Sequence, residues 1–297
     1  MKTLHEVLKD AELREVAVGH FNFSELVVLK AIVAAARDLD VPVLLGVSES
    51  EREFVGVRQA VALIKSMRDE YDHPVFLNAD HTHSLAKAEE AAKAGFDEIL
   101  FDGSSLPLEE NVQQTKKAVE AIKSIDASIL VEGEVGYVGT SSEILEKVPE
   151  GANVLTTPEE AKQFVEATGI DALAPAVGNM HGLLQTMVRG EAEKRLHIER
   201  IADIKRTTGV FLTLHGGSGT NDDDLKKAIK AGITIIHINT EIRLAWRRGI
   251  EASLALKPQA VSPYKILPGA FQAVKDVVNA RLQLFSSKLP GTKSQAA

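Results

Sequence analysis

The sequence predicts an α/β fold, a single (β/α)8 barrel with an additional helix at each end of the chain. Eight short apolar segments, rich in β-branched residues, alternate with segments of helical period along the 297 residues. This alternation requires parallel strands joined by right-handed crossovers. Eight such units favour a closed barrel over an open, doubly wound sheet, and no linker-like composition divides the chain.

Each predicted strand is a short and nearly continuous apolar run, which is typical of strands buried on both faces of a parallel sheet. Polar or glycine-rich segments bound these runs. The predicted strands are residues 16–22, 41–48, 74–81, 98–102, 128–134, 171–177, 210–215 and 234–239.

Several of the helical segments begin at recognisable capping residues. Ser24 and Ser84 precede apolar residues at helical spacing, and Thr157 opens a capping box with proline at the first helical position. The expected helices are 1–14, one after Ser24, 57–69, one after Ser84, 108–124, one from 157, 198–207, one from 221, 241–254 and 269–289. We expect one domain over 1–297, with a disordered tail at about 288–297.

Composition excludes several classes of protein. The net charge of −8 argues against a nucleic-acid partner, and no apolar run reaches the roughly 20 residues of a membrane span. The first 14 residues lack the apolar core of a signal peptide, so a cytoplasmic location is expected. Because the chain has no cysteine, any metal must be held by His, Asp, Glu, backbone or water.

Two long segments lack any clear period, at 136–155 and 179–193. Loops of this length in compact domains are usually functional or disordered. The first follows the strand that carries Glu134, so it could close over a ligand, and we expect it to be mobile without substrate.

The stretch FLTLHGGSGT, residues 211–220, joins a strand to a glycine-rich turn and a helix. Glycines let the backbone approach a ligand closely, and successive N–H groups at a helix start can bind a phosphate. The alternative is a histidine at a strand end followed by a flexible turn.

Polar residues gather at the predicted strand ends, which share one mouth in a barrel. His81, His181 and His215 come from three different strand ends, and three imidazoles with an open position form a catalytic zinc arrangement. Asp102 and Glu134 would add an oxygen-rich site beside it. Taken singly, these residues could instead be hydrogen-bonded rim histidines and solvated rim carboxylates.

Six motifs carry a family resemblance that covers about residues 1–285: NADHTHS, FDGSS with PLEEN, VEGEVGYVG, GNMHG, LHGGSG and HINTEIR. In this order they resemble the class II, metal-dependent ketose-bisphosphate aldolases. The resemblance implies a (β/α)8 barrel that cleaves fructose 1,6-bisphosphate, or alternatively tagatose 1,6-bisphosphate, to glycerone phosphate and glyceraldehyde 3-phosphate. It also implies a homodimer or homotetramer.

The resemblance also implies a role for each matching residue. His81, His181 and His215 match the ligands of a catalytic Zn²⁺, and Asp80 matches the residue that protonates and deprotonates the aldehyde-side oxygen. Asp102 and Glu134 match the position of a second divalent or monovalent cation. Substrate contacts are expected from Asn22, Ser48, Gly182, Gly216, Gly217, Ser218, His237, Asn239 and Thr240.

The chemistry of these residue types supports the metal route. Breaking a C–C bond next to a carbonyl leaves a negatively charged enediolate, which a zinc ion can stabilise as a Lewis acid. Class I aldolases use a lysine Schiff base instead. No predicted strand end here presents a lysine, because Lys87, Lys116 and Lys117 lie on helix faces.

The sequence departs from the family pattern at two positions. Ser141 and Ser142 stand where a pair of acidic residues commonly follows the strand-five loop motif, so Glu143, or alternatively Glu146, is predicted to supply the ketose-side base. His237 stands where the family usually has asparagine. These departures keep two further hypotheses open: an aldolase for a different phosphorylated ketose or aldehyde, and a sugar-phosphate-binding barrel without turnover. Retention of the three histidines and Asp80 argues against the latter.

Overall fold

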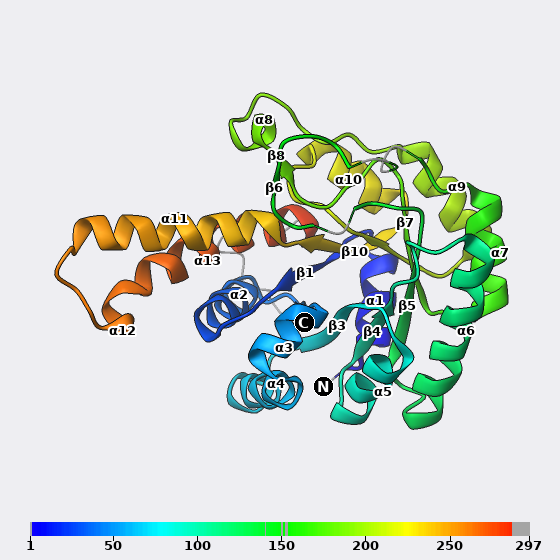
Figure 1. Ribbon diagram of the computed structural model, residues 1–297, viewed down its shortest axis with the longest axis horizontal. Coiled ribbons are helices and arrows are strands. Elements are labelled where there is room, and N and C mark those ends of the chain that lie inside the picture. The colour runs from blue at the N-terminus through cyan, green and yellow to red at the C-terminus, as the bar shows by residue number, and fades with distance from the viewer. Residues whose placement is uncertain (1, 140, 150, 152–153, 287–297) are drawn as a thin grey trace.

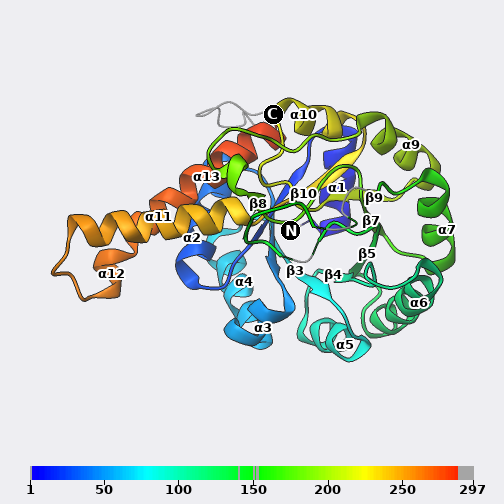
Figure 2. The same ribbon diagram turned by 45° about the horizontal axis from the view of Figure 1, so that its top comes forward.

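The structure is a computed structural model that describes residues 2–139, 141–149, 151 and 154–286. The tail predicted to be disordered, 288–297, lies outside these residues. Eight parallel strands close into a barrel, as predicted, in the order β1-β10-β9-β7-β5-β4-β3-β2 (Figures 1 and 2). The strands are β1 (Val18–Asn22), β2 (Val43–Val47), β3 (Val75–Thr82), β4 (Glu98–Phe101), β5 (Leu130–Val135), β7 (Ala172–Pro175), β9 (Phe211–Leu214) and β10 (Ile233–Ile238).

Helices surround the barrel and bury their apolar faces against the strands. The predicted helices correspond to α1 (Leu4–Leu13), α2 (Leu26–Leu39), α4 (Val57–Tyr71), α5 (Leu85–Ala94), α6 (Leu108–Ile125), α7 (Pro158–Thr168), α9 (Ile198–Thr208), α10 (Asp222–Lys230), α11 (Thr240–Leu256) and α13 (Pro268–Ser286). Short helices that were not predicted are α3 (Glu49–Val55), α8 (Gln185–Val188) and α12 (Pro263–Ile266). None of the described helices is both long and apolar enough to cross a membrane.

Helix α1 closes the amino-terminal end of the barrel. Its apolar residues, including Leu4 and Leu8, pack against Val18, Phe76 and Ile235 at the starts of the strands. Thr3 and Glu6 form a capping box at its first turn. Because this end is filled by side chains, the open end of the barrel is the carboxyl-terminal mouth.

The two segments without clear period meet above that mouth. Each contributes a two-residue strand, β6 (Ile144–Leu145) and β8 (Leu183–Leu184), and these strands pair in parallel. Strands of two residues are too short to produce a period in the sequence, which explains why they were not predicted. Their pairing fixes the loop after β5 to the loop that carries His181.

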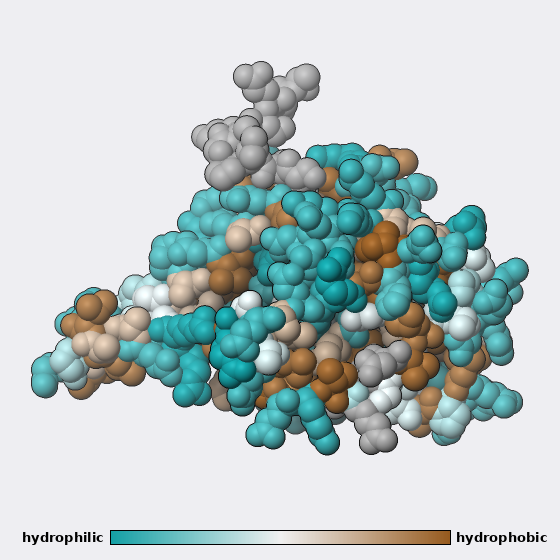
Figure 3. Space-filling model, turned by 90° about the horizontal axis from the view of Figure 1, so that it is seen from above, coloured by the Kyte–Doolittle hydropathy of each residue, from teal (hydrophilic) through white to brown (hydrophobic). Residues whose placement is uncertain are grey.

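Helices α11, α12 and α13 form an arm that extends away from the barrel (Figures 1 and 2). A side chain at Gly249 of α11 would meet the backbone of Ala270 of α13 at 2.6 Å, so glycine permits the close packing of the two helices. The outer end of the arm carries exposed apolar side chains, Leu256, Val261 and Tyr264, and Figure 3 shows hydrophobic surface there.

Candidate active site

A pocket of about 490 Å³ opens at the carboxyl-terminal mouth. It is lined by residues at or beyond the carboxyl ends of all eight barrel strands, and it holds nearly all of the predicted site residues. Those that line it are Asn22, Ser48, Asp80, His81, Asp102, Glu143, His181, Gly182, His215, Gly216, Ser218, His237, Asn239 and Thr240. Gly217 and Glu134 lie next to lining residues but do not line the pocket themselves.

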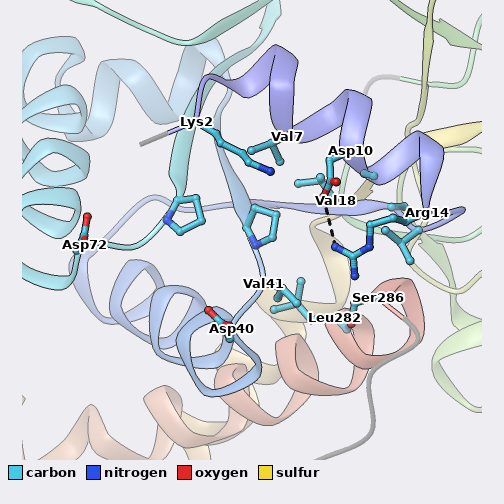
Figure 4. Close-up of a pocket in the computed structure, with 15 residues that line it drawn as sticks. Lys2, Val7, Asp10, Arg14, Val18, Asp40, Val41, Asp72, Leu282 and Ser286 are labelled. Atoms are coloured by element: carbon cyan, nitrogen blue, oxygen red, sulfur yellow. Dashed lines mark hydrogen bonds and ion pairs between the residues drawn. The ribbon is translucent and has the colours of Figure 1, made fainter. Parts of the chain in front are cut away.

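A second cavity, of about 350 Å³, lies at the opposite end of the barrel between α1, α2 and α13 (Figure 4). Its walls are mainly apolar, and its charged residues include the ion pair of Asp10 with Arg14. The groups of side chains that could hold a metal ion, among the described residues, all lie at the mouth instead.

His81, His181 and His215 converge as the sequence predicted. One nitrogen from each ring lies within 4.8 Å of the other two. A second nitrogen on each ring has its own partner: His81 Nδ1 donates to Asp102 at 2.7 Å, His181 Nδ1 to the Gly139 carbonyl at 2.7 Å, and His215 Nε2 to Glu132 at 2.9 Å. Such outer partners fix the orientation of metal-binding imidazoles.

The electrostatics of the ring cluster differ from one histidine to the next. Burial, followed by the charge of His81, lowers the pKa of His215 to about 3 and holds that of His181 well below its usual value. Burial also disfavours charge on His81, but Asp80 and Asp102 outweigh it and raise the pKa of His81 to about 10. His181 and His215 are therefore neutral, which is the form that binds a metal.

Asp102 and Glu134 approach His81 from one side. Ser104 donates to Asp102 through its N–H and its hydroxyl, and Glu134 lies 3.9 Å from His81 Nδ1. His81, Asp102 and Glu134 form a group whose ligand atoms could hold a cation. Burial, then the charge of Asp102, raises the pKa of Glu134 well above its usual value. Since Asp102 already accepts from His81, its clearest role is to orient that ring.

A backbone irregularity places the neighbours Asp80 and His81 on the same pocket. Successive side chains of a strand point to opposite faces, yet both of these residues line the mouth. The register of β3 against β4 shifts between Ala79 and Thr82, and His81 has a φ of 42°, in the left-handed region. Buried Arg52 of α3 supports this turn by donating to the Asp80 carbonyl at 3.2 Å and the Thr82 hydroxyl at 3.0 Å.

Asp80 is held from two sides. Asn22 donates to its carboxylate at 2.8 Å and to Glu51 at 2.9 Å. Ring nitrogens of His81 and His237 each lie 3.7 Å from its other oxygen, which accepts no hydrogen bond from the described residues. Burial would raise the pKa of Asp80, but the neighbouring histidines and the bond from Asn22 hold it below its usual range.

The glycine-rich turn after β9 combines internal bonds with free donors. The Gly217 N–H donates to the His237 carbonyl at 3.0 Å, so Gly217 shapes the turn and its N–H is already occupied. The N–H groups of Gly182, Gly216 and Ser218 have no acceptor among the described residues, and all three residues line the pocket. Gly216 has a φ of 60°, and a Cβ there would lie 2.2 Å from the Met180 carbonyl oxygen. The arrangement suits an anion.

The two loop residues predicted as bases differ in their position relative to the pocket. Glu143 lines it, with its carboxylate exposed and 3.8 Å from Arg243 of α11, whereas Glu146 is exposed and is not a lining residue. Thr240 donates to the Ser142 carbonyl at 3.0 Å and so ties this loop to the start of α11.

Several functional neighbours were missed by sequence reasoning. Arg52 and Glu51 lie on the short helix α3, His20 lies in the middle of β1, and Lys194 follows an aperiodic segment. A capping box at Ser48 and Glu51 was the available signal for α3. Lys194 is buried, and its Nζ lies within hydrogen-bond distance of four backbone carbonyls beside the pocket.

A parallel barrel with a histidine and carboxylate cluster beside free backbone donors defines the class of barrel enzymes with sites suited to a metal ion and an anionic substrate. Comparison with known proteins gives the family. Residues 2–289 match the family model for fructose-bisphosphate aldolase class-II. The chain belongs to this family and is an aldolase, a carbon–carbon lyase.

Relatives match along nearly the whole chain. A probable fructose-bisphosphate aldolase of Bacillus subtilis is 36% identical over 288 residues, which are 96% of this chain and 97% of that protein. A fructose-bisphosphate aldolase of Staphylococcus aureus is 34% identical over the same shares. The crystal structure of the YdjI aldolase from Escherichia coli K12 matches with a TM-score of 0.81 and 27% identity, over 97% of each chain.

Proposed function

We propose that the protein catalyses reversible aldol cleavage of fructose 1,6-bisphosphate to glycerone phosphate and glyceraldehyde 3-phosphate, with zinc held by His81, His181 and His215. One observation carries the proposal: three imidazoles from separate strand ends converge, each with one nitrogen committed to an outer partner. The buried Nδ1 of His215, which has no partner among the described residues, fits a metal ligand. A bound zinc ion would supply Lewis-acid stabilisation of the negative charge on the substrate oxygens.

The protein's own groups would perform binding and proton transfer. The free N–H groups of Gly182, Gly216 and Ser218 would bind the ketose phosphate. Asp80, fixed by Asn22, would return and remove the proton of the aldehyde-side hydroxyl. Glu143 would take the proton from the ketose-side carbon once its exposed side chain turns into the pocket. The test is cleavage of fructose 1,6-bisphosphate by zinc-loaded protein, with loss of activity on chelation and return on adding zinc.

A second candidate is an aldolase whose aldehyde partner lacks a phosphate. The pocket wall away from the glycine-rich turn carries Glu49 and Glu53 with Ser48 and Ser50. Arg243 is the sole lysine or arginine among the described lining residues, and it is engaged by Glu51 at 2.8 Å. Glu53 is paired with Lys87 at 2.6 Å, so the repulsion of a second phosphate would come from Glu49. Because Arg243 is already engaged, this part of the pocket favours a neutral polyhydroxy aldehyde. A third reading, a sugar-phosphate-binding barrel without turnover, predicts phosphate binding without cleavage in the same assay.

We also propose that the protein is a homodimer or homotetramer located in the cytoplasm. Leu256, Val261 and Tyr264 at the end of the arm are 74–89% exposed, as expected of a surface that a second copy covers. Light scattering should give a multiple of the 32.1 kDa chain mass. The variant Val261→Glu should lower that mass.

A further inference from the structure

The buried ammonium of Lys194 lies at the centre of four backbone carbonyls. Its Nζ is 2.6 Å from Met180 O, 2.8 Å from Gly182 O, 2.9 Å from Gly216 O and 2.6 Å from Ser218 O. The residue is 4% exposed. Burial lowers the pKa of Lys194 to about 7. A neutral amine has two N–H groups and a lone pair that would face carbonyl oxygens, whereas the three N–H groups of the ammonium can serve the four carbonyls if one N–H is shared, so the geometry favours the charged form.

The four carbonyls belong to the two loops that build the pocket. Met180 and Gly182 flank His181, and Gly216 and Ser218 follow His215. The main chain of Lys194 joins the same structure, because its N–H donates to Gly219 O and its carbonyl accepts from the Asn221 N–H.

Each of the four peptide groups is fixed at both ends. Their carbonyls point to Lys194, and the N–H groups of the same peptides donate elsewhere: His181 to Val138, Leu183 to Glu143, Gly217 to His237, and Gly219 to Glu241. The intervening N–H groups, those of Gly182, Gly216 and Ser218, have no acceptor among the described residues. Because these four peptide groups are fixed, the N–H groups between them remain available to a ligand in the pocket.

We propose that Lys194 is a positioning residue whose ammonium acts as an internal cation, joining the loops of His181 and His215 and holding the backbone donors that bind phosphate. The positive charge also favours an anion nearby, since charges interact strongly away from water. The inference rests on the proposed function in one respect, because it takes the anion to be the phosphate of the proposed substrate.

The test uses inorganic phosphate as the probe and the metal-loaded protein. Isothermal titration of Lys194→Ala and Lys194→Gln should show phosphate affinity reduced about tenfold or more, which corresponds to losing one charge-assisted contact. In Lys194→Ala, ammonium or potassium ions should enter the vacated carbonyl cage and restore affinity. Tetramethylammonium, which is too large and has no N–H, should not.

Lys123→Ala is the matched control, because Lys123 also donates to a backbone carbonyl, that of Ile129 at 2.7 Å, but lies on α6 away from the loops. It should bind phosphate as the wild type does, with no response to ammonium. If Lys194→Ala folds only in ammonium or potassium, the internal-cation role is supported. Unchanged phosphate affinity in folded Lys194→Gln, or equal effects of ammonium and tetramethylammonium on Lys194→Ala, would overturn it. Phosphate binding is measured without turnover. A failed aldolase assay would therefore count against the proposed function and not against the role of Lys194.

Discussion

The rings of His20 on β1 and His237 on β10 stack face to face, with centroids 3.4 Å apart and planes 4° apart. Both residues are buried, and His20 has no hydrogen-bond partner on either nitrogen among the described residues. The strands pair at this point, so the stack is fixed by the barrel itself. It holds the His237 ring beside Asp80.

The burial of His20 in this stack predicts that the free energy of unfolding decreases at acid pH. Burial lowers the pKa of His20 to about 4 from 6.5. The unfolded chain therefore binds the proton first as pH falls, and the stability of the neutral buried ring, complete above pH 6.5, is lost toward pH 4. The loss should be about 3 kcal/mol in the free energy of unfolding. The free energy of unfolding should be measured with denaturant at several pH values in this range, with chelator added to both the wild type and His20→Leu. It should fall less steeply with decreasing pH in His20→Leu than in the wild type. Equal slopes would contradict the assignment.

Removing any one metal histidine should remove the metal and the activity together. We expect His81→Ala, His181→Ala and His215→Ala to lose bound zinc in elemental analysis, because each ring would supply one of three protein ligands. His83→Ala is the control, since His83 lies two residues after His81, just beyond the end of β3, but outside the converging group. Full zinc content in the three single variants would refute this site.

Asp80→Asn should separate proton transfer from metal binding. The amide keeps the shape and the contact with Asn22 but cannot take a proton, so turnover should fall by about 10² to 10⁴. Zinc content should stay at the wild-type level. A variant that keeps near-normal turnover would exclude Asp80 as the aldehyde-side acid and base.

The loop after β5 should supply the ketose-side base. Glu143→Gln should slow the exchange of the glycerone phosphate C–H proton with solvent by about 10² to 10⁴, with zinc retained. Glu146→Gln is the matched control, since Glu146 is on the same loop but does not line the pocket. Wild-type exchange in both variants would place the base elsewhere, and His237 is then the next titratable group to test.

The two phosphates of fructose 1,6-bisphosphate should contribute unequally to kcat/KM. The free donors of Gly182, Gly216 and Ser218 would bind one phosphate, whereas Glu49, which follows β2, lines another part of the pocket. Omitting the carbon-1 phosphate, as in fructose 6-phosphate, should lower kcat/KM by about 10³ or more, whereas fructose 1-phosphate should lose about tenfold or less. A greater loss with fructose 1-phosphate would mean that a cation outside the described lining residues binds the second phosphate.

The sequence predicted what depends on local pattern. Each barrel strand is an apolar run that ends in polar residues, so His81, His181 and His215 could be placed at one mouth without coordinates. The contacts of Arg52 with Asp80 and of Arg243 with Glu51 join residues 28 and 192 positions apart, and no period in the chain reports such pairs. Lys194 was missed for a related reason: its carbonyl partners are backbone atoms, which carry no residue signature.

The arm has a mechanical consequence for the pocket. Helix α11 has 17 residues, about 25 Å of rod, and its first turn carries Thr240 and Arg243 at the pocket while it ends at exposed Leu256. A second copy of the chain bound at the outer end of the arm and a substrate bound in the pocket would therefore contact opposite ends of the same helix. Such coupling is reciprocal: whatever factor association adds to substrate affinity, substrate adds to association.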